Sequence, residues 1–238
     1  MEMAAARCES AARLLVSART AGELFVQRSV GGSGGGGASA SGSSSDQPTG
    51  GRPVWDIWPQ AFHAPSDDDR SHLVEVSAPF CDPSKWISGT NDGGIDVPGR
   101  DVNCLSNSIA TEQTWRGASS CAGVRIGGNM PGWEGVISDE MGGAPWHMNM
   151  RLDEIGDALT RAGHGSSAIV YCTWSNGGAH VFNIVNFEGN LRWVDGQPGI
   201  AGEWPPQVFM RDGRPAGYSE QYMKEIWFCG QDGMGNPL

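Results

Sequence analysis

The sequence contains no Cys-x-x-Cys pair, no long apolar run and no excess of basic residues. Its six cysteines are spread from Cys8 to Cys229, and without paired spacing they do not predict a zinc site. Their density is also low for a domain held together by disulfides, so we expect most of them to be reduced and structural. No metal site and no cofactor are predicted.

The N-terminal region also lacks an uninterrupted apolar segment. Its longest apolar run, Leu14-Leu15-Val16, has arginines around it. Neither a signal peptide nor a membrane-spanning helix fits that pattern. We therefore expect no signal peptide and no membrane partner, and export would need a non-classical or specialised secretion route.

Acidic residues outnumber basic ones, with 27 Asp and Glu against 16 Lys and Arg and a net charge of −11. Residues 1–51 carry as many basic as acidic side chains, so the negative charge belongs to residues 52–238. Because contacts to phosphates need clustered Lys and Arg, a nucleic-acid partner is not expected.

Glycine is abundant, and much of the excess lies in residues 31–45, which contain only Gly, Ser and Ala. Such a segment cannot bury a core and behaves as a flexible coil. We therefore predict that residues 1–51 form a disordered leader and linker. Residues 52–238 are expected to form one folded domain, which is long enough for a sizeable core.

A helix is predicted to begin at Cys104. Asn103 is a preferred N-cap residue, Leu105 and Ile109 begin an apolar stripe at helical spacing, and Gly117 suits the end of the helix. At the first helical position, the positive end of the helix dipole favours a thiolate over a thiol. Cys104 is therefore a candidate nucleophile, and a small buried residue without chemical role is the alternative.

The remaining pattern predicts an α+β fold in which this helix packs on an antiparallel β-meander. The clearest helix spans residues 151–162 and ends at Gly163. Strands are expected over residues 168–174, 179–187 and 191–195, and a last strand or helix over residues 221–228. Residues 119–145, rich in glycine and proline, are predicted to form a loop.

The turn at residues 188–189 relates three polar side chains. If it is a two-residue loop, residues 187 and 190 pair, and His180, Asp195 and Gln197 point to one face of the sheet. Diagonal neighbours on a face lie ~7–8 Å apart at the backbone, within imidazole–carboxylate reach. A three-residue loop would move Asp195 to the other face. With the even loop, His180 is a candidate base and Asp195 the acid that orients it.

Four further stretches are informative together: Gly99-Arg100-Asp101-Val102-Asn103-Cys104, Trp115-Arg116-Gly117, Gly178-Ala179-His180-Val181-Phe182-Asn183 and Val194-Asp195-Gly196-Gln197-Pro198-Gly199. They occur in the same order and context as in the papain-fold glutamine-deamidase toxin domains of bacterial polymorphic toxins. The chain resembles these domains over roughly Trp86 to Gly199. The resemblance implies a papain-like fold and hydrolysis of a protein glutamine side-chain amide to glutamate, with release of ammonia.

By this resemblance, Cys104 would be the nucleophile, His180 the general base and acid, and Asp195 the residue that orients His180. The thiolate would attack the carboxamide carbon, and water would hydrolyse the resulting thioester. The backbone N–H of Cys104 is the first expected oxyanion donor, and Asn103 and Gln197 are candidates for further oxyanion or substrate contacts. The resemblance also implies a protein substrate with a reactive glutamine, a cognate immunity protein, and action in the cytoplasm of a target cell.

The triad leaves the reaction open. A papain-like cysteine protease uses the same three groups on a peptide bond, and a transglutaminase-like acyl transferase replaces the water by an amine. A non-catalytic binding domain with a structural cysteine is a further alternative from a different class.

Overall fold

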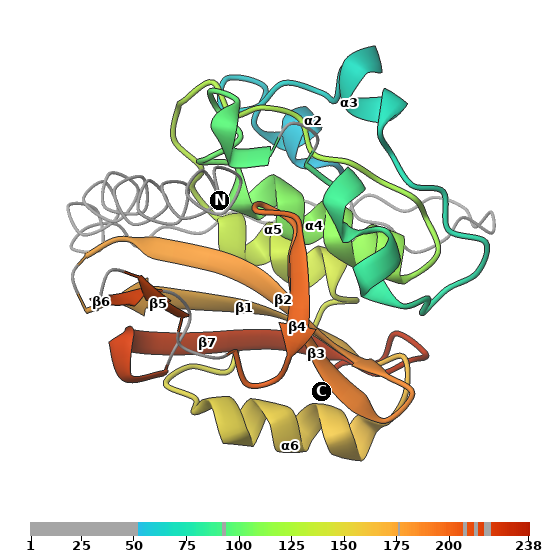
Figure 1. Cartoon of the computed structure of the whole chain (residues 1–238), viewed down its shortest axis with the longest axis vertical. Helices are drawn as coiled ribbons and strands as arrows, with labels where there is room; N and C mark the ends of the chain where they lie inside the picture. Colours follow the sequence, from blue (N-terminus) through green and yellow to red (C-terminus); the bar gives the residue numbers. More distant parts are fainter. Residues whose placement is uncertain (1–51, 92–93, 176, 207–208, 212–213, 217–219) are drawn as a thin grey trace, which may run out of the picture.

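A five-stranded antiparallel sheet forms the centre of the computed structural model, with strand order β4-β3-β2-β1-β7 (Figure 1). The structure describes residues 52–91, 94–175, 177–206, 209–211, 214–216 and 220–238; the predicted leader and linker lie outside the described residues. The strands of this sheet are β1 Ser167–Trp174, β2 Ala179–Phe187, β3 Asn190–Asp195, β4 Ile200–Glu203 and β7 Met223–Gln231. A separate two-stranded sheet consists of β5 Phe209–Arg211 and β6 Arg214–Ala216.

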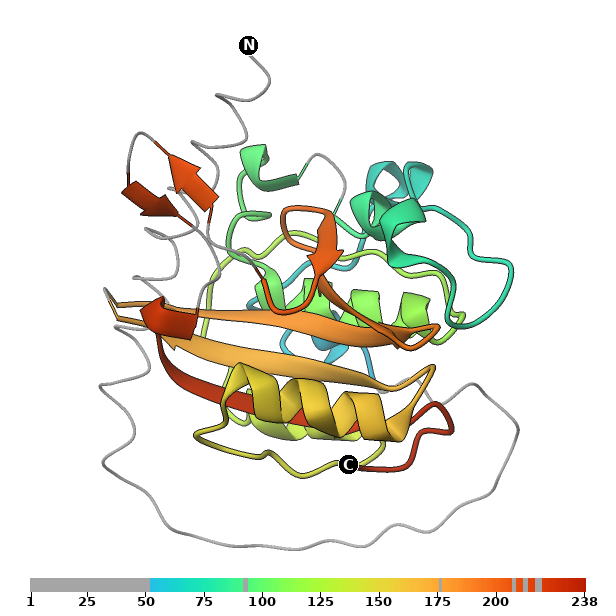
Figure 2. The same cartoon turned by 60° about the horizontal axis from the view of Figure 1, so that its bottom comes forward.

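Helices cover both faces of the large sheet. Helices α4 Cys104–Trp115 and α5 Trp133–Glu140 lie on one face, and α6 Leu152–Ala162 lies on the other (Figures 1 and 2). This arrangement confirms the α+β prediction with the Cys104 helix packed on an antiparallel meander. The shorter elements are α2 Val54–Ile57, α3 Asp67–Ser71, and the 3-10 turns η1 Pro83–Lys85, η2 Ile87–Gly89, η3 Gly94–Asp96 and η4 Glu220–Tyr222.

Strand β1 shows how the sequence fills both sides of the sheet. Ala168, Val170 and Cys172 pack in the cluster on the α6 face, whereas Ile169 and Tyr171 pack in the cluster on the α4 face. Successive side chains of a strand point to opposite faces, so alternate residues join different cores. With both faces covered, the central strands are buried along nearly their whole length.

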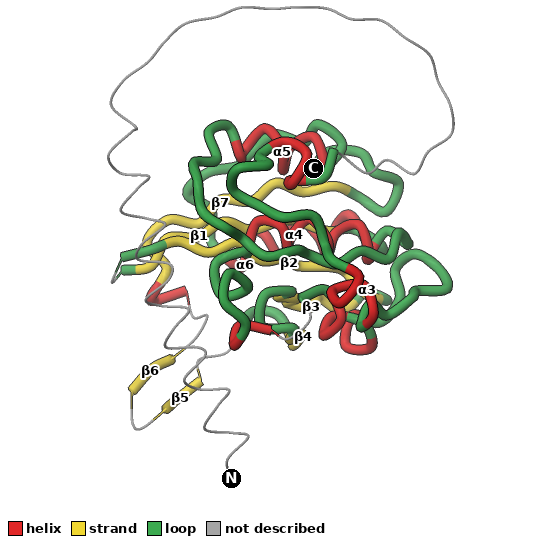
Figure 3. Tube along the Cα trace, turned by 90° about the horizontal axis from the view of Figure 1, so that it is seen from above, coloured by secondary structure: helices red, strands yellow, loops and turns green. Residues whose placement is uncertain are grey.

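Loops bury the remaining side of α4. Much of residues 52–103 and 116–132 lies over α4 on the side away from the sheet (Figures 1 and 3). Helix α4 is therefore enclosed almost all round, and many of its polar side chains are buried: Ser106, Asn107, Ser108, Thr111, Glu112 and Thr114. Among the described residues, no helix is long and apolar enough to cross a membrane.

The prediction of a loop over residues 119–145 is wrong in its second half, where α5 forms. Gly132, with φ +72°, precedes the helix, and Gly142, with φ +66°, follows it. Helix α5 is only two turns long and buries Ile137 within the α4-face core. One buried apolar residue gives little periodic signal, so the flanking glycines dominate the sequence pattern. At residues 221–228, the strand alternative is confirmed by β7.

The turn between β2 and β3 is the predicted two-residue loop. Phe187 pairs with Asn190, and the register continues without a shift to Asn183 and Val194. The two loop residues, Glu188 and Gly189, have φ values of +51° and +83°, as in the type I′ turn that matches the twist of paired strands. This turn fixes where the end of β3 lies along β2.

Glu188, the first residue of this turn, has a positive φ that glutamate does not favour. We expect Glu188→Asn to raise the free energy of unfolding by about 0.5–1 kcal/mol, because Asn tolerates a positive φ better than Glu. In a domain of this size the midpoint of thermal unfolding should rise by about 1–4 °C. Glu188→Ala, which has no better access to positive φ, is the control and should show no gain. A lower midpoint for the Asn variant would contradict this account of the turn.

Candidate active site

Cys104 is the first residue of α4 and is partly exposed. The N–H groups in the first turn of a helix have no acceptor within the helix, and their partial positive charge favours an anion there. Asn103 occupies the N-cap position, but its side chain makes no capping hydrogen bond. The prediction that Asn103 caps α4 with its side chain is therefore wrong, because its amide is bonded to other partners described below.

His180 and Asp195 meet where β2 begins and β3 ends. The His180 Nε2 and Asp195 Oδ2 atoms are 2.7 Å apart, and the two side chains are 4% and 1% exposed. The second oxygen of Asp195, Oδ1, accepts a hydrogen bond of 3.0 Å from the backbone N–H of Gln197. Both oxygens of the carboxylate are thus engaged, and the orientation of His180 is fixed.

The other ring nitrogen of His180 is directed to Cys104. His180 hydrogen-bonds the Cys104 side chain as well as Asp195. Because Nε2 is bonded to Asp195, Nδ1 is the nitrogen left for the thiol. Cys104, His180 and Asp195, which the sequence places up to 91 residues apart, are therefore brought together in one hydrogen-bonded row.

The edge of β2 holds the thiol in this row. Strand β3 pairs with β2 from Phe187 back to Asn183, where the partner is Val194. At Val181, the β3-facing edge of β2 is therefore not paired with β3. The backbone N–H of Val181 donates a hydrogen bond to the Cys104 sulfur. Two residues further along, Asn183 Nδ2 donates to the carbonyl of Ser108 in α4 at 3.1 Å. One strand therefore carries the histidine and also fixes the helix that carries the cysteine.

The electrostatics of the pair favour separated charges. Burial acts to raise the pKa of Cys104, but the hydrogen bond and charge of His180, the Val181 N–H and the Arg125 charge together hold that pKa below its ordinary value. Burial acts to lower the pKa of His180, but Asp195 and Cys104 raise it to about 10. A lowered thiol pKa beside a raised imidazole pKa favours a thiolate–imidazolium pair at neutral pH.

An apolar cluster borders Cys104. Cys104 packs against the core on the α4 face, which includes Leu105, Ile109 and Val181. Half-buried Trp133 borders the same core, with its ring centroid 5.0 Å from that of Tyr171. Such surroundings keep the local dielectric low, and a low dielectric strengthens the interaction between the cysteine and the histidine.

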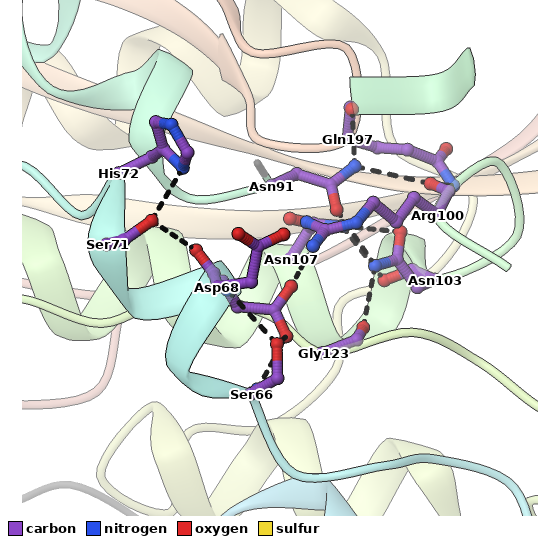
Figure 4. A network of polar contacts seen from close by, with 11 residues as sticks. Ser66, Asp68, Ser71, His72, Asn91, Arg100, Asn103, Asn107, Gly123 and Gln197 are labelled. Carbon is purple, nitrogen blue, oxygen red and sulfur yellow. Dashed lines mark hydrogen bonds and ion pairs between the residues drawn. The ribbon is translucent and has the colours of Figure 1, made fainter. Parts of the chain in front are cut away.

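Asn103 and Gln197 belong to a buried polar network (Figure 4). Asn103 Nδ2 donates to Asn91 Oδ1 at 3.0 Å and to the carbonyl of Gly123 at 2.8 Å. Gln197 Nε2 donates to the carbonyl of Arg100 at 3.3 Å. Their amide donors are thus bonded within the protein, and the contacts to oxyanion or substrate expected for them stay predictions.

Three charged or polar residues of the site were not among those singled out from the sequence. Asn91 bridges Asn103 and Gln197, Asp69 forms a buried ion pair with Arg100, and Arg125 acts on Cys104 through its charge. None of these three carried a sequence signal for the site, whereas Arg100, the partner of Asp69, stands in the stretch that leads to Cys104. Asn91 lies in a glycine-rich loop, where an isolated asparagine indicates nothing more than a turn.

None of the other cysteines in the described residues forms a disulfide bond. They are Cys81, Cys121, Cys172 and Cys229. Burial raises the pKa of Cys172 and of Cys229 above the ordinary value of a thiol, whereas the pKa of Cys104 is held below it. Within the residues that the structure describes, no group of three or more His, Cys, Asp or Glu side chains could hold a metal ion.

Comparison with known proteins gives one family match. The family model described as papain fold toxin 1, glutamine deamidase, matches residues 102–200. The matched range begins two residues before Cys104 and contains His180 and Asp195. No curated protein and no solved structure matches the chain.

Proposed function

We propose that this chain, whose residues 102–200 belong to the papain-fold toxin family of glutamine deamidases, hydrolyses the side-chain amide of a glutamine in a target protein. Cys104 is the nucleophile, His180 the general base and acid, and Asp195 the residue that orients His180. The observation that carries the proposal is the His180–Asp195 hydrogen bond of 2.7 Å, with the second ring nitrogen of His180 turned to the Cys104 thiol.

Acylation begins from the thiolate–imidazolium pair. The Cys104 sulfur attacks the carboxamide carbon of the glutamine, and a tetrahedral oxyanion forms. His180 then gives its proton to the departing nitrogen, the C–N bond breaks, and ammonia leaves. The product is a thioester between Cys104 and the former glutamine side chain. Asp195 keeps the imidazole in the orientation and tautomer that this transfer requires.

Deacylation uses the imidazole that acylation leaves neutral. His180 takes a proton from a water molecule, and the hydroxide attacks the thioester carbon. The C–S bond then breaks, and glutamate and the Cys104 thiolate are released, with the proton on His180. The oxyanion in both steps needs preorganised donors, and the backbone N–H of Cys104 at the start of α4 is suited to be one of them.

The family description also bears on partners. A deamidase of a toxin family acts on a protein of the cell that receives it, so we propose a protein substrate and action inside a target cell. A cognate immunity protein is proposed on the same ground. The acidic character of the chain, with a net charge of −11, supports a protein partner over a nucleic acid.

Mass spectrometry of proteins from a host-cell lysate tests the proposal. The lysate is incubated with the wild-type protein or with Cys104→Ala, and peptide masses are compared. A Gln-to-Glu change, which adds about 1 Da to an intact chain and is absent with the variant, supports the deamidase. Shortened chains would indicate a protease instead, and addition of an amine would indicate an acyl transferase. Identical spectra from the two samples would contradict a catalytic function.

The pKa shifts of the pair predict the pH dependence of the reaction. We expect kcat/KM to rise with pH as Cys104 deprotonates, at a pH below the ordinary range of a thiol. It should fall again as His180 loses its proton, near pH 10. The reaction needs thiolate and imidazolium together, so the plateau lies between these two limits. Initial rates on a glutamine peptide across this pH range measure both limbs of the profile. An acidic limb near pH 8.5 or above would refute a lowered pKa for Cys104.

A further inference from the structure

We infer that Asn91 is a positioning residue that holds the nucleophile and the acid of the site in register with each other. Asn91 lies outside the stretch that matches the family and is not part of the triad. The inference rests on the proposed function, because it concerns the same site and the same reaction. It adds a residue on which the alignment of Cys104, His180 and Asp195 depends.

Asn91 makes three hydrogen bonds with a side chain that is 2% exposed (Figure 4). Its Oδ1 accepts from Asn103 Nδ2 at 3.0 Å. Its Nδ2 donates to the carbonyl of Gln197 at 2.7 Å and to the carbonyl of Arg100 at 3.2 Å. One amide therefore joins the segment of residues 100–103, which leads into α4, to the segment after β3 that contains Gln197.

Each of these two segments adjoins one of the reacting groups. Asn103 is the residue directly before Cys104, at the N-cap of α4. Gln197 holds Asp195 Oδ1 with its backbone N–H at 3.0 Å while its carbonyl is bonded to Asn91. The sequence of contacts Cys104–Asn103–Asn91–Gln197–Asp195 thus forms a second connection between nucleophile and acid, besides the one through His180.

The surrounding bonds make this connection stiff. Asn103 Oδ1 accepts from Asn107 Nδ2 at 2.6 Å, one helical turn further along α4. On the other side, Gln197 Nε2 and Asn91 Nδ2 both donate to the carbonyl of Arg100. The guanidinium of Arg100 forms an ion pair with Asp69, and both side chains are buried. A buried network in which the amides are bonded permits few alternative arrangements.

Loss of Asn91 would leave buried polar groups without partners. The Gln197 carbonyl would lose its Asn91 donor, and an Asn103 N–H would lose its acceptor, so both neighbouring segments would shift to regain partners. Such a shift moves Asp195, and with it His180, relative to the Cys104 sulfur. Displacements of ~1 Å in an active site can lower a rate by about 100-fold.

Enzyme kinetics and thiol alkylation of Asn91→Ala test the inference. We expect kcat/KM for the glutamine substrate to fall about 100-fold with KM within about threefold of wild type. Alkylation of Cys104 by iodoacetamide, followed on the Cys104 peptide by mass spectrometry, should require a pH about one unit higher to reach half its maximal rate. Loss of packing alone would lower the unfolding temperature without moving this alkylation profile.

Asn186→Ala is the matched control. Asn186 is 1% exposed and lies at the far end of β2 from His180. It also uses both ends of its amide, donating to the Leu159 carbonyl at 2.9 Å and accepting from the Gly189 N–H at 2.9 Å. We expect Asn186→Ala to lower the unfolding temperature and to leave kcat/KM and the alkylation profile unchanged.

Asn91→Asp serves if Asn91→Ala does not fold, because it keeps the size of the side chain and the acceptor for Asn103. When ionised it has no donor for Gln197, so both readouts should change in the same direction as for alanine. The inference is overturned if the Asn91 variant that folds keeps kcat/KM within twofold of wild type and reaches half its maximal alkylation rate at the same pH as wild type. Alkylation needs no substrate, so a shifted profile supports the role of Asn91 even if the wild-type protein deamidates nothing.

Discussion

Replacing Cys104 with alanine is expected to lower kcat for deamidation by at least about 10⁴-fold while the protein remains folded. Removal of the nucleophile eliminates the thioester route, and what remains is binding and the oxyanion donors. The side chain is partly exposed and lies at the border of the core, so its loss leaves only a small packing defect. Rates with a glutamine peptide and ammonia release measure the first effect, and circular dichroism and thermal unfolding measure the second.

Cys81→Ala is the control for this experiment. Cys81 is a free thiol with similar partial exposure, and it donates to the carbonyl of Ala78 at 2.9 Å, away from the triad. Its replacement should leave the rate within about twofold of wild type. Residual activity of Cys104→Ala at a tenth of the wild-type rate would assign the chemistry to another group and remove the basis of the proposed mechanism.

Asp195→Asn is expected to lower kcat/KM by about 10²–10⁴-fold and to move the basic limb of the pH profile to lower pH. In wild type each carboxylate oxygen accepts one hydrogen bond, from His180 and from the Gln197 N–H. Asparagine has a single oxygen, so one of these donors would face an NH₂ group. The charge of Asp195 also raises the pKa of His180, and without it the imidazolium loses its proton below pH 10.

A shift of the basic limb to lower pH distinguishes a carboxylate that orients His180 from one with only a structural role. Glu112→Gln removes another buried carboxylate, which accepts from Arg116 at 2.9 Å, Ser167 at 2.7 Å and Gln231 at 3.0 Å. We expect this variant to lose stability but to keep the basic limb of wild type. An unshifted basic limb in Asp195→Asn would show that His180 does not depend on the charge of Asp195.

Local sequence rules were sufficient for much of the fold and for the geometry of the triad. The register of β2 and β3 followed from the length of one turn, because the side-chain period of a strand is two. That register places His180 beside Asp195, as the distance of 2.7 Å confirms. The start of α4 at Cys104 followed from the residue type of Asn103, which occupies the N-cap position although its side chain makes no capping hydrogen bond.

Long-range polar contacts could not be predicted in this way. Asn103 is a favoured capping residue by type, but its amide is used by Asn91, Gly123 and Asn107 instead. A run of three aspartates is typical of solvated surface, and nothing in it distinguishes Asp69, which is 4% exposed and paired with Arg100. These partners are chosen by tertiary packing, about which hydrophobic periodicity carries no information.

The position of β7 bears on when, during synthesis, the proposed site can form. Strands β1 to β3 are joined by short turns, but β7 pairs with β1 from about 50 residues further along the chain. Strand β7 also supplies Ile226 and Phe228 to one core and Cys229 to the other. Neither core closes before this strand has left the ribosome, because a domain generally folds as a unit. Residues 104, 180 and 195 are therefore translated early, yet their alignment waits for residues 223–231.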